Sequence, residues 1–382
     1  MIDPDSQIPM VDLKGQYLRI KPEIDNAIQS VIDSCSFING LQVGEFATDL
    51  ESYTGVRHVI PVANGTDALQ IALMALKLQP GDEVIVPAFT YIASAEVVAL
   101  LGLVPVMVDV DYESFNVTAA HIQKAITPRT KAIIPVHLFG QSCPMEEILQ
   151  LAEANDLFVI EDNAQSLGSV YSFSEGKEQQ AGTMGHFGCT SFFPTKNLGC
   201  MGDGGALMTN DDDLAFRAKM IASHGQSKKY VHDVIGCNSR LDTIQAAILS
   251  VKLHHLNDYI EERQLVAKRY YEGLSDLNSI LLPRKMPYTS HTFHQFTIKV
   301  TNGKRDELKK FLAAHGIPSM VYYPLPLQEQ EAFTDIVREG EQLPNSELLC
   351  QQVLSLPIHT EMTEEVQNFI IEKIREYAEQ GE

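Results

Sequence analysis

Lys196 is the residue whose surroundings best suit covalent chemistry. An apolar run at residues 189–193 predicts a buried strand, and Pro194 then turns the chain into a glycine-rich loop that carries Lys196. Burying an unpaired ammonium group costs several kcal/mol, whereas a deprotonated amine is a nucleophile toward carbonyls. We therefore interpret Lys196 as a Schiff-base lysine. The simpler alternative is an exposed lysine on a turn, where most lysines lie.

Asp162 is the second candidate, because it closes a separate apolar run at residues 157–162. A carboxylate at the end of a buried strand needs a cation, and the protonated ring nitrogen of pyridoxal phosphate would be one. Two alternatives stay open: a helix-capping aspartate, and a magnesium ligand shared with Glu161. Asp109 and Asp111 could add carboxylates to such a metal site, but no recognisable spacing joins them.

A third segment, Asn64-Gly65-Thr66-Asp67, lies between an apolar run and a helical pattern. A glycine allows close approach of the backbone, and free amides at the start of a helix bind anions, so this loop suits a phosphate. Ser191 could add a hydroxyl. The alternatives are an ordinary capped helix for the loop and a polar residue satisfied within its strand for Ser191.

Aromatic and small residues follow two other predicted strands. A flat cofactor needs a ring against one face and a small side chain against the other, and Phe89 and Ala164 could supply these. For a single phenylalanine, packing in the core is the commoner explanation.

Short apolar runs recur along the first half of the chain, with helical segments between them. The runs occupy residues 59–63, 83–87, 104–109, 131–136, 157–162, 189–193 and 205–209. Because they are continuous and β-branched rather than alternating, they predict strands covered on both faces. We therefore expect an α/β fold with one large, mostly parallel sheet between helices, and ligands at the strand ends.

The second half of the chain has a different pattern of apolar residues. A long helical periodicity runs from Leu241 to Leu274 and is long enough to connect two domains. A smaller α/β unit is expected beyond it, from strands at 293–300 and 319–323, a helix at 305–314 and a final helix. We place an N-terminal segment and large domain at residues 1–250 and a small domain at 251–382.

Composition narrows the possible partners. The 382 residues carry a net charge of -21, which opposes binding to nucleic acid and to acidic membranes. Six scattered cysteines show no paired spacing, so we predict neither a zinc site nor a disulfide framework. No signal peptide or membrane-spanning segment is expected, and a cytoplasmic location fits best.

The motifs together resemble the StrS/DegT family of nucleotide-sugar aminotransferases. The resemblance rests on the order and spacing of six segments and runs nearly from end to end. These segments are Gly65-Thr66-Asp67-Ala68-Leu69, residues 87–91, residues 161–166, residues 191–196, Gly202-Asp203-Gly204-Gly205 and Asn238-Ser239-Arg240-Leu241-Asp242. It implies a fold type I enzyme of the aspartate-aminotransferase type, with a seven-stranded, mostly parallel sheet and a small C-terminal domain.

The resemblance also implies roles for individual residues. Pyridoxal 5'-phosphate would attach to Lys196, and Asp162 would pair with its ring nitrogen. Gln165 would approach the ring oxygen, Phe89 and Ala164 would hold the two faces, and the phosphate would be received by Gly65, Thr66, Asp67 and Ser191. Asn238 would reach the phosphate site of a neighbouring subunit in a homodimer. Arg240 would meet an anionic group of the substrate, unless it pairs structurally with Asp242 or another carboxylate.

The expected reaction moves the amino group of L-glutamate onto a nucleotide-linked keto-sugar. Lysine at position 196 favours transamination, because relatives that remove a sugar hydroxyl carry histidine there. The motifs look most like those of enzymes that aminate carbon 3 of a UDP-2-acetamido-3-keto-hexuronic acid for surface polysaccharides such as lipopolysaccharide. A dTDP-3-keto-6-deoxyhexose and a carbon-4 specificity remain alternatives.

One departure from the family bears on the sugar. Many relatives have His-Tyr-Pro where this chain has Tyr322-Tyr323-Pro324, so a phenol replaces an imidazole at a possible substrate contact. Both tyrosines could instead pack within the small domain. A different class of function also stays open, a non-catalytic regulator that binds the cofactor, although Lys196 and Asp162 are both retained.

Overall fold

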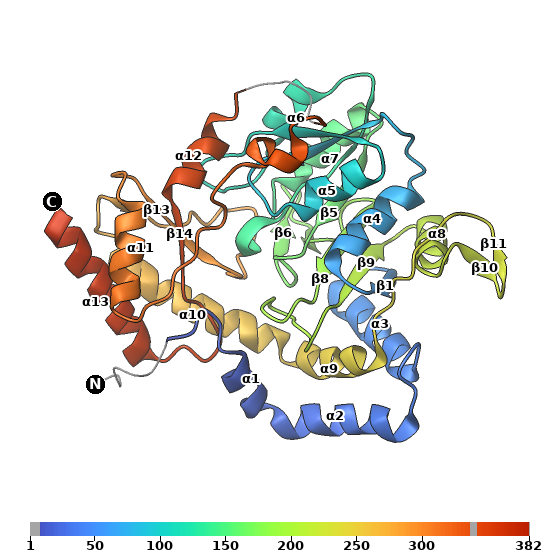
Figure 1. Cartoon of the computed structure of the whole chain (residues 1–382), viewed down its shortest axis with the longest axis horizontal. Coiled ribbons are helices and arrows are strands. Elements are labelled where there is room, and N and C mark those ends of the chain that lie inside the picture. Colours follow the sequence, from blue (N-terminus) through green and yellow to red (C-terminus); the bar gives the residue numbers. More distant parts are fainter. Residues whose placement is uncertain (1–7, 337–341, 382) are drawn as a thin grey trace.

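The computed structural model describes residues 8–336 and 342–381 and is built on one seven-stranded sheet (Figure 1). The strand order is β1-β9-β8-β5-β4-β2-β3. The strands are β1 (His58–Val62), β2 (Glu83–Pro87), β3 (Val104–Val108), β4 (Thr130–Ile133), β5 (Phe158–Asp162), β8 (Phe187–Ser191) and β9 (Gly205–Thr209). Each apolar run identified in the first half of the sequence forms one of these strands, so the predicted sheet is confirmed.

The sheet is parallel except at β9. Strands β8, β5, β4, β2 and β3 pair in parallel, whereas β9 is antiparallel to both of its neighbours, β1 and β8. A parallel pair needs a crossover connection, but an antiparallel pair can be joined by a loop alone. The loop between β8 and β9 therefore contains no crossover helix, and this loop carries Lys196.

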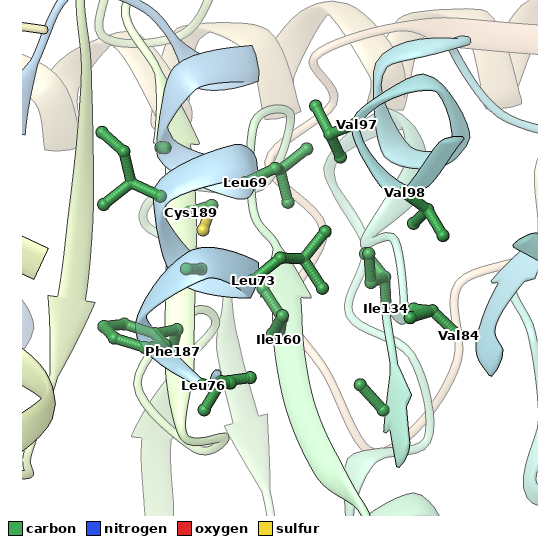
Figure 2. Packing of buried hydrophobic residues seen from close by; sticks show 14 of the residues in the cluster. Leu69, Leu73, Leu76, Val84, Val97, Val98, Ile134, Ile160, Phe187 and Cys189 are labelled. Atoms are coloured by element: carbon green, nitrogen blue, oxygen red, sulfur yellow. The ribbon is translucent and has the colours of Figure 1, made fainter. Parts of the chain in front are cut away.

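Helices cover both faces of the sheet. One face packs against α4 (Gly65–Ala75), α5 (Ala93–Leu100) and α8 (Asp212–Ala222). The other face packs against α3 (Leu41–Thr54), α6 (Ala119–Ala125), α7 (Met145–Ala154) and α9 (Thr243–His254). Figure 2 shows Leu69 and Leu73 of α4 and Val97 of α5 packing toward the strands. Two-sided burial explains why the strand sequences are continuously apolar.

The long helical stretch after Leu241 is two helices rather than one. Helix α9 ends at His254, and α10 (Leu256–Leu274) begins two residues later, with His255 at the junction. On the large-domain side, α9 packs against α3 and against α2 (Lys21–Ser34), which follows α1 (Leu13–Arg19). The boundary expected after residue 250 falls within α9 and stays a prediction.

The small domain contains a three-stranded antiparallel sheet of β12 (Ile280–Leu281), β13 (Phe296–Val300) and β14 (Val353–Leu356). This sheet shares a core with α10, α11 (Arg305–Ala314) and α13 (Glu364–Gly381). Outside these units lie two hairpins, β6 (Val170–Ser172) with β7 (Glu178–Gln180) and β10 (Gln226–Lys228) with β11 (Val231–His232). Short 3-10 turns occupy Leu138–Gly140, Leu327–Glu329 and Glu331–Phe333.

The strand expected at residues 319–323 is wrong. Only Met320 forms a bridge there, to Ser355 of β14, and the rest of the segment is irregular. Pro318 and Pro324 flank it, and proline cannot donate to a ladder of strand hydrogen bonds. The irregular segment instead delivers Tyr322 and Tyr323 to the large domain.

Two buried contacts fix the small domain on the large one. Asp109, just after β3, accepts hydrogen bonds from the backbone N–H groups of Asn345 and Ser346 and from the Ser346 hydroxyl at 2.7–3.0 Å. These groups open α12 (Pro344–Gln352), so Asp109 stabilises the first turn of that helix. In addition, Lys299 of β13 donates to the Tyr112 carbonyl at 2.8 Å and lies 4.1 Å from the centre of the Tyr112 ring.

No helix within the described ranges is both long and apolar enough to span a membrane. The cysteines, all in the described part of the chain, are unbridged, as the scattered spacing predicts.

Candidate active site

A cavity of about 830 Å³ opens where β1, β2, β5 and β8 end, and residues of the small domain close one side of it. Open α/β sheets place ligands at this edge, as the sequence analysis expects. The predicted site residues in its wall are Gly65, Thr66, Asp67, Asp162, Ala164, Gln165, Ser191, Lys196, Tyr322 and Tyr323. Residues far apart in the sequence therefore meet around one space.

Lys196 presents an amine without a partner to this cavity. Within residues 8–336 and 342–381 its Nζ makes no hydrogen bond and no ion pair. Burial lowers the pKa of Lys196 from 10.5 to about 8, and the nearby Asp162 carboxylate opposes this shift without reversing it. Roughly a tenth of the amine is thus unprotonated at pH 7, and this is the form that attacks a carbonyl.

The loop that carries Lys196 is held tightly. A Cβ atom on Gly199 would lie 2.4 Å from the Pro194 carbonyl oxygen, so a side chain there would collide with the turn itself. From helix α9, the Lys252 ammonium donates to the Gly199 carbonyl at 2.8 Å. Gln245 of the same helix bonds both the N–H and the carbonyl of Met201. Helix α9 therefore fixes the position from which Lys196 projects.

Asp162 ends β5 and lies almost fully buried, with 6% of its surface exposed. The Ser94 hydroxyl donates to one carboxylate oxygen at 2.8 Å, and the backbone N–H of Ala164 donates to the other at 3.1 Å. Both oxygens are oriented by neutral donors, while the Lys196 amine acts on the carboxylate only through its charge. The carboxylate is therefore prepared for a cationic ligand atom in the cavity.

Glu161 does not share a cation with Asp162. Its carboxylate accepts three backbone N–H groups, those of Gly182, Met184 and Gly185, at 2.6–2.8 Å. It also pairs with the buried His137 ring at 2.8 Å. Because these bonds occupy Glu161 behind the cavity, and because Asp109 holds α12, these two of the carboxylates weighed for magnesium binding are engaged in structural contacts.

The loop after β1 forms an anion cradle. Helix α4 starts at Gly65, and the Asn64 side chain caps it by accepting the Asp67 N–H at 2.7 Å. The capped-helix interpretation is therefore confirmed, but the cap uses only the Asp67 amide, and the first amides of a helix have no partner within it. A Cβ atom on Gly65 would lie 2.7 Å from the Ser191 Cβ, so glycine permits the approach of the Ser191 hydroxyl to this cradle.

Phe89 does not line the cavity. Its side chain is 1% exposed and packs against the rings of Phe115, Phe139 and Tyr323. Tyr91, two residues further along, lines the cavity and is 59% exposed. The loop after β2 therefore does reach the cavity, but through Tyr91. Phe89 lies closer to the strand, where side chains enter the core.

Gln165 and Tyr323 are linked to each other in the cavity wall. The Gln165 amide nitrogen donates to the Tyr323 hydroxyl at 3.3 Å, while its oxygen accepts the Phe139 N–H at 2.8 Å. Burial raises the pKa of both Tyr322 and Tyr323, so their phenols stay protonated.

Asn238 and Arg240 lie outside the cavity wall of this chain. Asn238 is exposed and forms a bridge with Ser223. Within the described residues, Arg240 forms no ion pair with Asp242 or with another carboxylate, so the structural alternative considered for it does not occur there.

Among the cavity residues that the sequence did not predict are His294 and Gln295. They precede β13, which begins at Phe296 rather than at Phe293 as expected. The available signal was a histidine and a glutamine directly before an apolar strand. The predicted strand included both residues, so neither was identified as a site residue.

Comparisons with known proteins agree with this geometry. A model of the DegT/DnrJ/EryC1/StrS aminotransferase family matches residues 18–375. The chain is 46% identical to the pleiotropic regulatory protein of Geobacillus stearothermophilus, over 97% of this chain and 98% of that protein. It is 45% identical to the UDP-2-acetamido-2-deoxy-3-oxo-D-glucuronate aminotransferase of Pseudomonas aeruginosa, over 92% and 95%. Its identity to the UDP-N-acetyl-3-dehydro-alpha-D-glucosamine 3-aminotransferase of Acidithiobacillus ferrooxidans is 44%, over 94% and 95%.

Solved structures show the same likeness. An aminotransferase of this family from Brucella abortus superimposes with a TM-score of 0.92 at 43% identity, over 97% of this chain and 99% of that one. The Bacillus subtilis protein NtdA, solved with bound PMP, gives a TM-score of 0.89 at 32% identity, over 98% and 86%.

Pyridoxal phosphate fits the residues that line the cavity. A free amine, an oriented carboxylate and an anion cradle match its aldehyde, ring nitrogen and phosphate. The family match and the likeness to a structure solved with PMP agree with this cofactor. From its fold, its site and its relatives, the chain belongs to the DegT/DnrJ/EryC1/StrS family and is a pyridoxal-phosphate-dependent sugar aminotransferase.

Proposed function

We propose that this enzyme transfers the amino group of L-glutamate to carbon 3 of a UDP-2-acetamido-3-keto-hexuronic acid, for surface polysaccharide synthesis. The observation that carries the chemistry is the unpartnered Lys196 amine, with its pKa lowered to about 8, beside the buried Asp162. A UDP-linked 3-keto sugar is supported by the names of two relatives, at 45% and 44% identity, and a hexuronic acid by the name of the first, a 3-oxo-D-glucuronate aminotransferase.

The cavity residues predicted from the sequence have these roles in the proposal. Lys196 would hold the cofactor, and its amine would accept the proton from the α-carbon of the amino donor. Asp162 keeps the ring nitrogen protonated, and the bound cofactor supplies the electron sink. Thr66, Ser191 and the first amides of α4 bind the phosphate, because these donors converge at a helix N-terminus. Asp67 contributes less than expected, since its N–H is used by Asn64.

The substrate side of the cavity comes from the small domain. Tyr322 and Tyr323 would donate phenolic hydrogen bonds to the sugar, since burial keeps both protonated. Ala164 would lie against one face of the cofactor ring and Tyr91, rather than Phe89, against the other. Gln165 would reach the ring oxygen through the amide that now bonds Tyr323.

We also propose that two copies of the chain complete each other's sites. The segment that contains β10 and β11 exposes large apolar side chains, with Tyr230 81% and Ile235 86% accessible. In Figure 1 this hairpin projects from the edge of the large domain. A second copy would cover this segment and bring Asn238 and Arg240, which lie outside the cavity of their own chain, to the neighbouring cavity.

A second candidate is a regulator that binds the cofactor without turnover. The relative at 46% identity is named a pleiotropic regulatory protein. The retained Lys196 amine favours catalysis, and the amino-donor experiment below separates the two.

The first prediction concerns Lys196→Ala. Because the variant lacks the amine that attaches the cofactor and moves the proton, its turnover should fall by more than about a thousandfold.

Wild-type enzyme should lose its cofactor absorption band on addition of L-glutamate and regain it only with the correct keto-sugar. Supplying UDP- and dTDP-linked 3-keto and 4-keto sugars one at a time identifies that sugar. A wild-type band that ignores every amino donor would support the regulator instead.

The second prediction follows from the lowered pKa of Lys196. The rate at which the cofactor-free protein captures pyridoxal phosphate should rise about tenfold per pH unit below pH 8 and level off above it, because only the free amine reacts. Stopped-flow absorbance measures this rate. A rate that climbs steadily to pH 10 would show that Lys196 keeps its ordinary pKa.

The third prediction compares Tyr91→Ala with Phe89→Leu. Removing the Tyr91 ring should weaken cofactor retention about tenfold, since the ring lies in the cavity wall. Phe89→Leu should lower the melting temperature but leave cofactor affinity nearly unchanged, because Phe89 packs in the core. Dialysis against buffer, followed by absorbance, measures retention. The opposite pattern would restore the role first assigned to Phe89.

The fourth prediction tests the shared site. Lys196→Ala and Asn238→Ala proteins, each poorly active alone, should recover about a quarter of wild-type activity when mixed and refolded together. Half of the dimers are then mixed, and each mixed dimer contains one site with both residues intact. If Asn238 served its own chain, mixing would restore nothing.

A further inference from the structure

His294 is a cavity residue without any assigned role. It lies in the loop before β13, and the loop is anchored to the large domain on both sides of it. Thr292 N–H donates to the Gly140 carbonyl at 2.8 Å, and Gln295 N–H donates to the Phe139 carbonyl at 3.3 Å. The Asn197 amide, next to Lys196 in the chain, donates to the Thr292 carbonyl at 3.3 Å. The position of His294 is therefore coupled to that of the reactive lysine.

The His294 ring is buried but has no partner. Its exposed fraction is 5%, and its Nδ1 atom is buried without a hydrogen bond. Within the described part of the chain, neither ring nitrogen is bonded to protein. Two other buried histidines differ: His137 uses both nitrogens, for Glu161 and the Cys143 N–H, and His291 accepts the Phe293 N–H. His359 is also buried and unpartnered, but it lies outside the cavity wall, where no ligand would reach it. Buried polar groups in proteins are nearly always paired, so the vacant bonding capacity of His294 points to a ligand.

The surroundings keep this imidazole neutral. Burial lowers the pKa of His294 well below 6.5, and the positive charges of Lys196 and Arg263 lower it further. Arg263 donates to the His294 carbonyl at 3.4 Å. In residues 8–336 and 342–381, no carboxylate forms an ion pair with the His294 ring. A neutral imidazole suits a hydroxyl, amide or carbonyl better than a carboxylate or phosphate, which would favour the charged form.

We propose that His294 is a specificity-determining residue that hydrogen-bonds a neutral oxygen or N–H group of the sugar, on a carbon adjacent to the one being aminated. The inference rests on the proposed function, because it assumes that the sugar enters beside Lys196. It assigns His294 to the sugar rather than to the amino donor, whose carboxylate requires a cation. The sugar carries several hydroxyl groups, and one of its polar groups would supply the hydrogen-bond partner that the protein does not give to the His294 ring.

The test separates the two half-reactions of the cofactor-loaded enzyme in His294→Phe, His294→Asn and wild type. Stopped-flow absorbance follows conversion by L-glutamate and, in a second experiment, return of the band with UDP-2-acetamido-3-keto-glucuronic acid. We expect His294→Phe to lower kcat/KM for the sugar by about 30-fold to 100-fold, with a loss of no more than about threefold for glutamate. His294→Asn, which keeps a hydrogen-bonding group, should recover part of the loss.

His359→Phe is the matched control. His359 is 4% exposed and has both ring nitrogens unpartnered, but it lies outside the cavity wall. This variant should leave the ratio of the two half-reactions unchanged, and thermal melting of every variant monitors the fold. A readout independent of turnover is the dissociation constant of the UDP-3-amino sugar product, measured by calorimetry, which should rise about tenfold or more in His294→Phe alone.

The outcomes distinguish this inference from the proposed function. If wild-type enzyme does not respond to L-glutamate or to any 3-keto sugar, the proposed function fails, whatever His294 does. If wild type turns over but His294→Phe lowers both half-reactions equally, lowers neither, or loses the cofactor on dialysis, His294 does not determine sugar specificity and the inference is overturned.

Discussion

The burial of one lysine amine opposite one carboxylate is the constraint on which this structure depends. Lys196 has a pKa lowered to about 8 because it is buried, and Asp162 remains close without neutralising the effect. Maintaining this arrangement requires a rigid loop and an oriented acid. Helix α9 holds the loop through Lys252 and Gln245, and Ser94 orients the acid. The site thus depends on contacts from helices on both faces of the sheet.

The same constraint explains the direction of the last strand. Because β9 returns antiparallel to β8, the connection between them remains a loop at the edge of the sheet where the ligand cradle lies. A crossover helix there would leave no room for a tight turn around Lys196. Gly65 and Gly199 then allow the backbone segments to approach each other more closely than any side chain would permit.

The small domain completes the cavity because it is fixed to the large one. Asp109 binds the first turn of α12, and Lys299 binds the Tyr112 carbonyl, so the segment with Tyr322 and Tyr323 lies against the cavity in a defined position. His294 arrives from the same side and brings an imidazole that the protein leaves unpaired. The large domain therefore supplies the reacting groups, and the small domain supplies most of the side chains available to hydrogen-bond a substrate.

By itself the sequence determined the strands of the large sheet and the loops at their ends, and it identified Lys196 and Asp162 as candidate site residues, because continuous apolar runs and costly buried charges are local signals. Only the tertiary structure decided which side chain of a loop enters the cavity. Tyr91 does so and Phe89 does not, although both follow β2. Three further features appear only in the tertiary structure. The long helix is interrupted at His255, the segment at residues 319–323 is irregular rather than a strand, and His294 lies in the cavity wall. These outcomes depend on packing between segments distant in sequence, which no local pattern records.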